Sequence, residues 1–472
     1  MPKQPSNILL LLLALVVYFI YELKLISISF SYCILCTALL IALYQIVYKP
    51  HKEGLSLLSN GNAWILFGIF LIFVIAPISL HLSSDSLPLV FERRDWKSEY
   101  PQINLLATMS VLGLSAGNLH KSTRFKNIFS NKKIVNSKDI YAVALIAIIF
   151  WLSFYVLWAK SQGGIAAAVL SNRAQFAASG ATSSNGYGVD AIYGALGAMS
   201  VLIIVSCNSN RFLHKFLIFN YCILLIPSIF SGSRSKFVFY LVVLLIIKVS
   251  LGMKIARVHI LIGILILPLL LVAPRLYRGD SAGLSVEALS QSYSVKNIVN
   301  TLTQEDLAMA PALSILELQR NSGNVPNLYG TSYIGAILKP IPRKLFPTKP
   351  IEFDKRLNSL IFPTESKYVG LSFSALSEPL VNFGGFGVIL FFYLLGVSNR
   401  KYFSLREERS PLKGILIHAW MTGFMFVLIR GNLSVDYQRA LFPLGTALLV
   451  IKISDFLNSK SNEQSHQRTA LE

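Results

Sequence analysis

Arg234 lies in a short stretch, residues 230–241, where a charged side chain is unexpected and could bind an anion. The stretch reads FSGSRSKFVFYL and joins two long apolar segments with little more than a turn. A helix starting there would present unpaired backbone N–H groups and the positive end of its dipole. Hydroxyls of Ser231 and Ser233, with the planar guanidinium of Arg234, would add donors suited to phosphate. The alternative is that Arg234 only anchors the end of an apolar helix.

Further arginines follow apolar segments or stand in the long polar connections between them. They are Arg173, Arg275, Arg278, Arg343 and Arg430. Several guanidinium groups meeting in one place would bind a diphosphate, and Arg234 would then stabilise negative charge that develops during a reaction. Each arginine taken singly could instead form an interfacial anchor or an ion pair.

Glu378 is the candidate general base. It occurs in LSFSALSEPLVNFGGFG, just before an apolar segment, with Ser374, Ser377 and Asn382 nearby. A carboxylate beside apolar surface can accept a proton from a substrate hydroxyl, and Asn382 would help to bind that substrate. A helix-capping role or a salt bridge for Glu378 stays equally open.

Aromatic and carboxylate side chains of residues 274–383 add weaker candidates. Tyr333 could stack on a sugar face, although tyrosine is also common at membrane interfaces. Glu352 and Asp354 form a two-carboxylate pattern that favours a solvated surface over a metal site. These residues contain no histidine, so a histidine base within them is excluded. We expect no metal and no cofactor.

The elements that position these residues are apolar helices. The chain of 472 residues is 54% hydrophobic and 14% charged, whereas soluble domains carry about 25% charge. This composition predicts an all-α polytopic membrane protein with the lipid bilayer as a partner. Twelve apolar segments are expected, at about 7–21, 25–47, 62–82, 101–119, 140–159, 189–206, 214–230, 235–251, 257–273, 384–398, 412–429 and 438–453.

Lysine and arginine in the shorter connections predict the topology. With twelve helices, the most basic of these connections fall on one side together with both termini, and this side is cytoplasmic. The three expected regions are transmembrane helices 1–9 at 1–273, a large exterior loop at 274–383, and helices 10–12 with a cytoplasmic tail at 384–472. The net charge of +20 therefore reflects topology, and we expect no nucleic-acid partner.

The large loop is expected to be partly helical. Residues 284–300 and 303–321 have helical apolar spacing, with Thr303 as an N-cap and Asp306 in the first turn of the second helix. The proline-rich residues 338–350 predict a shaped, extended segment. Cys33, Cys36 and the other cysteines favour a packing role over a disulfide framework. The N-terminal apolar segment predicts an uncleaved helix.

The order of the motifs resembles one family of membrane enzymes. LSNRAQF (170–176), SGSRSK (231–236), YGTSYIGAILKPIPRKLFPTKP (329–350), SEPLVNFGGFG (377–387) and a final RG (430–431) together resemble the Wzy-type polymerases of bacterial O-antigen and capsule repeat units. The resemblance extends over residues 140 to 440. It implies a GT-C-like architecture, a bacterial inner-membrane location for lipopolysaccharide or polysaccharide biosynthesis, and a periplasmic active site.

The resemblance also implies the substrates. The donor glycan and the acceptor repeat unit would both be carried by undecaprenyl diphosphate, and a chain-length regulator is an open partner. Matching motifs assign diphosphate binding to Arg173, Arg234, Arg343 and Arg430, with Arg275 and Arg278 less firmly placed. Two other classes stay open: an O-antigen ligase-like glycosyltransferase, disfavoured because residues 274–383 lack a histidine, and a polysaccharide or lipid transporter.

Overall fold

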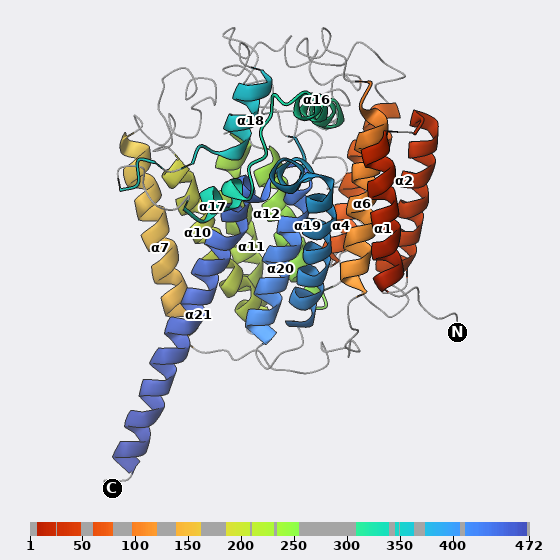
Figure 1. The fold of residues 1–472 in the computed structure, drawn as a ribbon. Helices are drawn as coiled ribbons and strands as arrows, with labels where there is room; N and C mark the ends of the chain where they lie inside the picture. The colour runs from red at the N-terminus through yellow and green to blue at the C-terminus, as the bar shows by residue number, and fades with distance from the viewer. Residues whose placement is uncertain are drawn as a thin grey trace, which may run out of the picture. The chain divides into compact units, whose positions relative to one another are not determined.

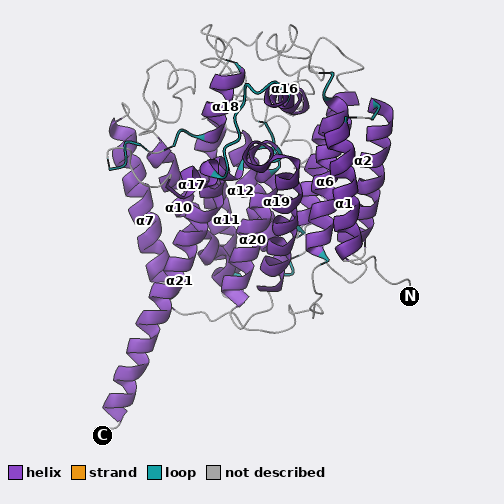
Figure 2. Ribbon diagram, in the orientation of Figure 1, coloured by secondary structure: helices purple, strands orange, loops and turns teal. Residues whose placement is uncertain are grey.

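In the part of the chain that it describes, the computed structural model consists of helices joined by short loops and turns, and no strand occurs there (Figure 2). The described residues are 7–24, 26–48, 60–78, 97–119, 138–161, 186–207, 210–230, 234–253, 308–338, 345–348, 350–362, 373–405 and 411–469.

The helices belong to two compact units, each built from separate parts of the chain. Unit 1 comprises Met1–Arg124, Tyr293–Phe403 and Phe424–Tyr437, and unit 2 comprises Phe125–Ser292, Ser404–Gly423 and Gln438–Glu472. Two helices, α20 (Pro411–Leu428) and α21 (Leu433–Thr469), contribute residues to both units. The remaining helices each lie within one unit, with α19 entering unit 2 only at its last residues.

Unit 1 contains helices from the N-terminal third and from the predicted large loop (Figure 1). They are α1 (Asn7–Leu23), α2 (Ile28–Ala42) with its π-helical continuation η1 (Leu43–Tyr48), α4 (Gly61–Phe70) with η3 (Leu71–Ile75), α6 (Tyr100–Asn118), α16 (Met309–Asn321), α17 (Thr331–Leu338), α18 (Phe353–Ile361) and α19 (Ser377–Leu405). Unit 2 contains α7 (Lys138–Ser161), α10 (Gly186–Ser206), α11 (Arg211–Phe230) and α12 (Arg234–Ser250).

The helices coincide with the expected apolar segments. Each of the twelve falls on a helix except 257–273, which lies outside the described residues. Five helical stretches of the described chain are long and apolar enough to cross a membrane, which is consistent with a helical membrane protein. They are Ile28–Ile46, Gly61–Ile78, Lys138–Lys160, Ser377–Lys401 and Arg439–Lys460.

One expectation about the limits of the apolar helices needs correction. The last helix does not end at residue 453, because α21 continues as a helix to Thr469. The segment expected at 384–398 begins where α19 is interrupted at Gly384, and a short helical part from Ser377 precedes it. Within the predicted loop, the described part contains α16, α17 and α18, which confirms that the loop is partly helical. The helix expected at 303–321 begins later, because α16 has Ala308 as its N-cap in place of the predicted Thr303. Thr303 and Asp306 themselves, the helix at 284–300 and most of 338–350 lie outside the described residues.

Helix α6 forms the core of unit 1 and is buried along nearly its whole length. Helices α1 and α2 pack against it, as Figure 1 shows. On α19, the backbone carbonyl oxygen of Tyr393 lies 2.1 Å from where a Cβ on Gly117 would be, and Leu114 O lies 2.4 Å from the corresponding position on Gly396. The two helix backbones are therefore in close contact, which only glycine permits at these positions.

We expect Gly117→Ala to lower the free energy of unfolding by about 1–3 kcal/mol, because the added methyl group would overlap backbone that cannot rotate away. Thermal unfolding of the purified protein in detergent measures the change. Gly445→Ala is the matched control, since no atom lies within 4 Å of its Cβ position and alanine is the better helix former. Equal thermal stability of Gly117→Ala and Gly445→Ala would show that α6 and α19 do not pack this closely.

Unit 2 is held together by aromatic packing. Trp420 of α20 is fully buried against Phe239 and Tyr240 of α12, with ring centroids 5.8 Å apart in both pairs. Its indole nitrogen donates a hydrogen bond of 3.4 Å to Ser200 of α10. This packing orients α12, the helix that Arg234 begins.

Candidate functional site

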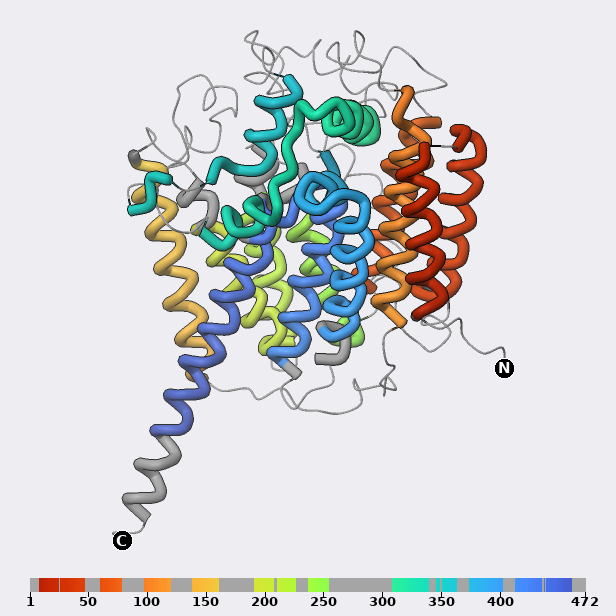
Figure 3. The backbone as a smooth tube through the Cα atoms, in the orientation of Figure 1, coloured from red at the N-terminus to blue at the C-terminus, as the bar shows by residue number. Residues whose placement is uncertain are grey.

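Glu378 lies in a short helical segment at the start of α19. Gly384, with φ 68°, separates this segment from the rest of the helix, and the chain changes direction there (Figure 3). Ser374, with φ 67°, stands just before it. The segment that carries Glu378 is therefore bounded by two residues with positive φ angles. These residues set the direction of the segment independently of the long part of α19.

The carboxylate of Glu378 is buried, with 1% of the residue exposed. Its Oε2 accepts a hydrogen bond of 3.1 Å from the backbone N–H of Ser434. Its Oε1 has no hydrogen-bond partner among the described residues. Because buried polar atoms are normally paired, Oε1 is the atom at which a proton or a ligand group would be stabilised.

The turn between α20 and α21 lies against the segment of Glu378. The backbone N–H of Ala375 donates to the carbonyl of Ile429 over 3.2 Å. The hydroxyl of Ser377 donates to Oδ1 of Asn432 over 2.9 Å, and Nδ2 of Asn432 donates to the carboxylate of Asp354 on α18. Arg430 is half-buried in this turn, two residues before Asn432. Two regions predicted to be functional, SEP and RGN, are thus neighbours.

Asn382 joins a third predicted region to the same place. Its Oδ1 accepts from the backbone N–H of Gly330 over 2.7 Å. Its Nδ2 donates to the hydroxyl of Ser332 over 2.8 Å and to the carbonyl of Glu378 over 2.7 Å. Asn382 is fully buried, so every bond of this side chain is made inside unit 1. Glu378, Asn382 and Asn432, together with the residues to which they are hydrogen-bonded, are called the amide–carboxylate cluster below. The bonded residues are Gly330, Ser332, Asp354, Ser377 and Ser434.

Tyr333 of α17 borders the amide–carboxylate cluster. Its ring stacks on that of Phe383, with centroids 6.4 Å apart and planes inclined by 16°. Burial raises the pKa of Tyr333, and the negative charge of Glu378 raises it further. The phenol therefore stays protonated and acts as a hydrogen-bond donor.

The structure brings together four of the predicted site residues, namely Glu378, Asn382, Tyr333 and Arg430, in unit 1. Arg234 is the first residue of α12 in unit 2, as the sequence predicts, and its side chain is not described. The other predicted residues, Arg173, Ser233, Arg275, Arg278 and Arg343, lie outside the described residues. Convergence of several of these arginines on one site stays a prediction.

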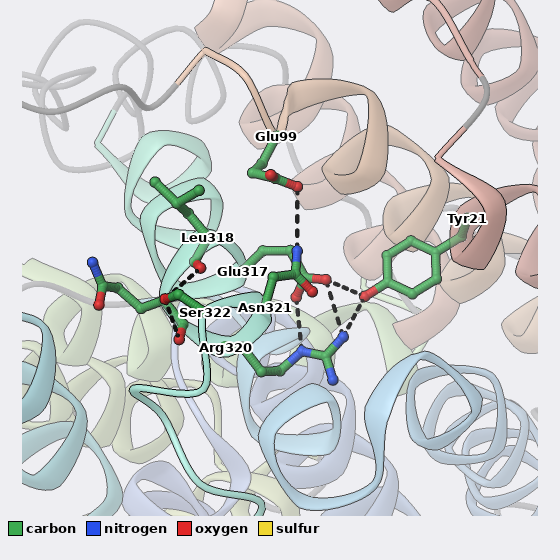
Figure 4. A network of polar contacts seen from close by, with 8 residues as sticks. Tyr21, Glu99, Glu317, Leu318, Arg320, Asn321 and Ser322 are labelled. Carbon is green, nitrogen blue, oxygen red and sulfur yellow. Dashed lines mark hydrogen bonds and ion pairs between the residues drawn. The ribbon is translucent and has the colours of Figure 1, made fainter.

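Sequence reasoning missed a buried ionic group formed by Tyr21, Glu317 and Arg320 (Figure 4). Nε of Arg320 lies 3.0 Å from Oε2 of Glu317, and one of its terminal nitrogens lies 3.0 Å from Oε1. The same nitrogen donates to the hydroxyl of Tyr21 over 2.8 Å, and that hydroxyl donates to Glu317. Burial lowers the pKa of Arg320, but the hydrogen bonds and negative charges of Glu317 and Tyr21 raise it by more. The pKa is therefore higher than usual, and the guanidinium stays charged.

This ionic group lies beside the break in α19. The other terminal nitrogen of Arg320 is 4.0 Å from where a Cβ on Gly384 would be. Glu317 and Arg320 are three residues apart on α16, a spacing that predicts an ion pair on a helix. Tyr21, which is 296 residues from Glu317, carries no signal in the sequence that could have linked it to them.

The sequence predicts that Glu352 and Asp354 are both solvated surface residues, and this prediction is right for Glu352 but wrong for Asp354. Glu352 forms an ion pair of 3.3 Å with Lys355, and both side chains are more than a third exposed. Asp354 is half-buried and accepts from Asn432, so it belongs to the amide–carboxylate cluster. Among the described residues, no three histidine, cysteine, aspartate or glutamate side chains are grouped so that they could hold a metal ion.

The chain was compared with protein-family models, with curated proteins and with solved structures, and none of the three comparisons found a match.

Proposed function

We propose that the protein is a Wzy-type polymerase of oligosaccharide repeat units carried by undecaprenyl diphosphate. The observation that supports this most is the amide–carboxylate cluster. It joins three of the motifs on which the resemblance depends: the YGTSYIG region through Gly330 and Ser332, the SEPLVNF region through Glu378 and Asn382, and the RGN turn. Segments so far apart in sequence would have no reason to share one buried polar network if each were only a connection.

The proposed architecture is GT-C-like, with twelve transmembrane helices and both termini in the cytoplasm. Residues 274–383 and the turn that contains Arg430 then face the periplasm, on the outer side of the bacterial inner membrane. The lipid-linked donor and acceptor both reach the site from the bilayer.

In the proposed reaction, an acceptor sugar hydroxyl attacks the anomeric carbon of the growing glycan. The new bond joins that oxygen to the anomeric carbon, and the bond from this carbon to the diphosphate oxygen breaks. The hydroxyl proton passes to Oε1 of Glu378, which accepts no hydrogen bond from any described residue. The electron pair leaves with the diphosphate, whose growing charge Arg430 stabilises.

The other side chains of the cluster act as positioning groups in this proposal. Asn382 and Asn432 hold the segment of Glu378 against the turn of Arg430, because both amides are buried and each forms hydrogen bonds through its oxygen and its nitrogen. The stacked ring of Tyr333 offers an aromatic surface and a protonated hydroxyl to a sugar.

A strain from which this chain is deleted tests the assignment. We expect its lipid A–core to carry single repeat units and no longer chains, because a ligase would still transfer an unpolymerised unit. Electrophoresis of the extracted lipopolysaccharide shows both products, and expression of the intact chain from a plasmid should restore the ladder. A bare lipid A–core would instead identify a ligase or an exporter, and an unchanged ladder would contradict all of these roles in O-antigen assembly.

A further inference from the structure

Helix α17 carries an exposed apolar face within the predicted exterior loop. Ile334 is 55% exposed and Ile337 is 76% exposed, whereas Ser332 and Ala336 on the same helix are buried. The helix, TSYIGAIL, contains no charged residue. A helix in contact with water normally places polar residues on its outer face, so α17 has the wrong pattern for an aqueous surface.

Backbone polar groups at both ends of α17 form hydrogen bonds with other helices. At its start, the N–H of Gly330 donates to Asn382, and the N–H of Leu328 donates to the carbonyl of Val381 over 3.0 Å. At its end, the carbonyl of Ala336 accepts from the hydroxyl of Tyr437. Water usually satisfies the ends of short surface helices, whereas hydrocarbon cannot, so a helix that enters a bilayer needs such partners.

The exposed face of α17 continues into the exposed stripe of α19. Phe383, which is half exposed, stacks on Tyr333 and lies 3.3 Å from the Cβ position of Gly330. Beyond the break at Gly384, Phe386, Leu390 and Leu394 lie at helical spacing, and all are exposed. These residues belong to a stretch long and apolar enough to cross a membrane, so their exposed stripe faces lipid.

We propose that α17 lies within the bilayer as a short non-spanning helix, with Ile334 and Ile337 in contact with lipid acyl chains. Asn382 and Tyr437 hold it there by its two ends. Part of the loop assigned to the exterior is therefore a membrane element. This inference stands apart from the proposed function, since it concerns only where α17 is placed.

Spin labels at positions 334 and 337 test this placement. Each position is changed to cysteine in a full-length chain whose Cys33, Cys36, Cys207 and Cys222 are replaced by alanine, and the labelled protein is reconstituted into phosphatidylcholine vesicles. Collision with oxygen, which concentrates in hydrocarbon, is compared with collision with a water-soluble nickel chelate. We expect oxygen to dominate at both positions, which gives a positive depth parameter.

The matched controls are labels at Ser322, just after α16, and at Ser359 on α18. Both are exposed polar residues of the same predicted loop, and we expect the nickel chelate to dominate there. Nickel dominance at 334 and 337 would place α17 in water and overturn the proposal. Low collision with both reagents would mean that a protein surface, such as a second copy of this chain, covers the helix, which would overturn it equally.

Discussion

Glu378→Gln is expected to abolish long glycan chains and to leave single repeat units on the lipid A–core. The proposed reaction needs a base that takes the proton of the acceptor hydroxyl, and loss of such a base slows a reaction by about 10²- to 10⁴-fold. The glutamine oxygen can still accept the hydrogen bond that Ser434 donates to Glu378. The variant should therefore fold, and the lost activity would report on the carboxylate itself.

The ladder of the extracted lipopolysaccharide measures the effect, with the amount of protein in the membrane determined alongside. Glu352→Gln is the matched control: it changes another carboxylate of the same predicted loop, one that is partly exposed and forms an ion pair with Lys355. We expect a normal ladder from this variant. A normal ladder from Glu378→Gln, at normal protein level, would remove Glu378 from the mechanism but would leave the deletion test of the overall function unaffected.

Arg320→Ala should cause a large loss of stability in unit 1. It would leave the carboxylate of Glu317, whose side chain is 1% exposed, without its positive partner. Breaking a buried ion pair in this way costs about 3–5 kcal/mol, because the remaining charge is neither hydrated nor compensated. Thermal unfolding of the purified protein in detergent measures the change.

The surface pair of Lys355 and Glu352 provides the comparison, since it has the same three-residue spacing on a neighbouring helix. The side chains are 64% and 37% exposed, so Lys355→Ala should change stability by only about 0–1 kcal/mol. We also expect Glu317→Gln combined with Arg320→Ala to be more stable than Arg320→Ala alone, because no unpaired charge remains. Equal effects of Arg320→Ala and Lys355→Ala would show that the ionic group in Figure 4 contributes little to stability.

The amino-acid sequence by itself determined where most of the described helices lie and that several of them are apolar enough to cross a membrane. Runs of apolar residues long enough to satisfy their own backbone bonds in hydrocarbon form helices whatever their neighbours are, so the expected segments and the helices agree closely. The sequence also singled out Glu378, Asn382 and the glycines that follow, because polar and conformationally special residues stand out beside an apolar run.

Only the tertiary structure decided which of these residues meet. The bond from Ser434 to Glu378 joins residues 56 positions apart, and Tyr21 reaches Glu317 across 296 positions. Partner choice depends on how complete helices pack, on close backbone contacts such as that of Gly117, and on the change of direction at Gly384. Local composition carries no information about such long-range contacts, which is why the ionic group around Arg320 and the role of Asp354 were not predicted.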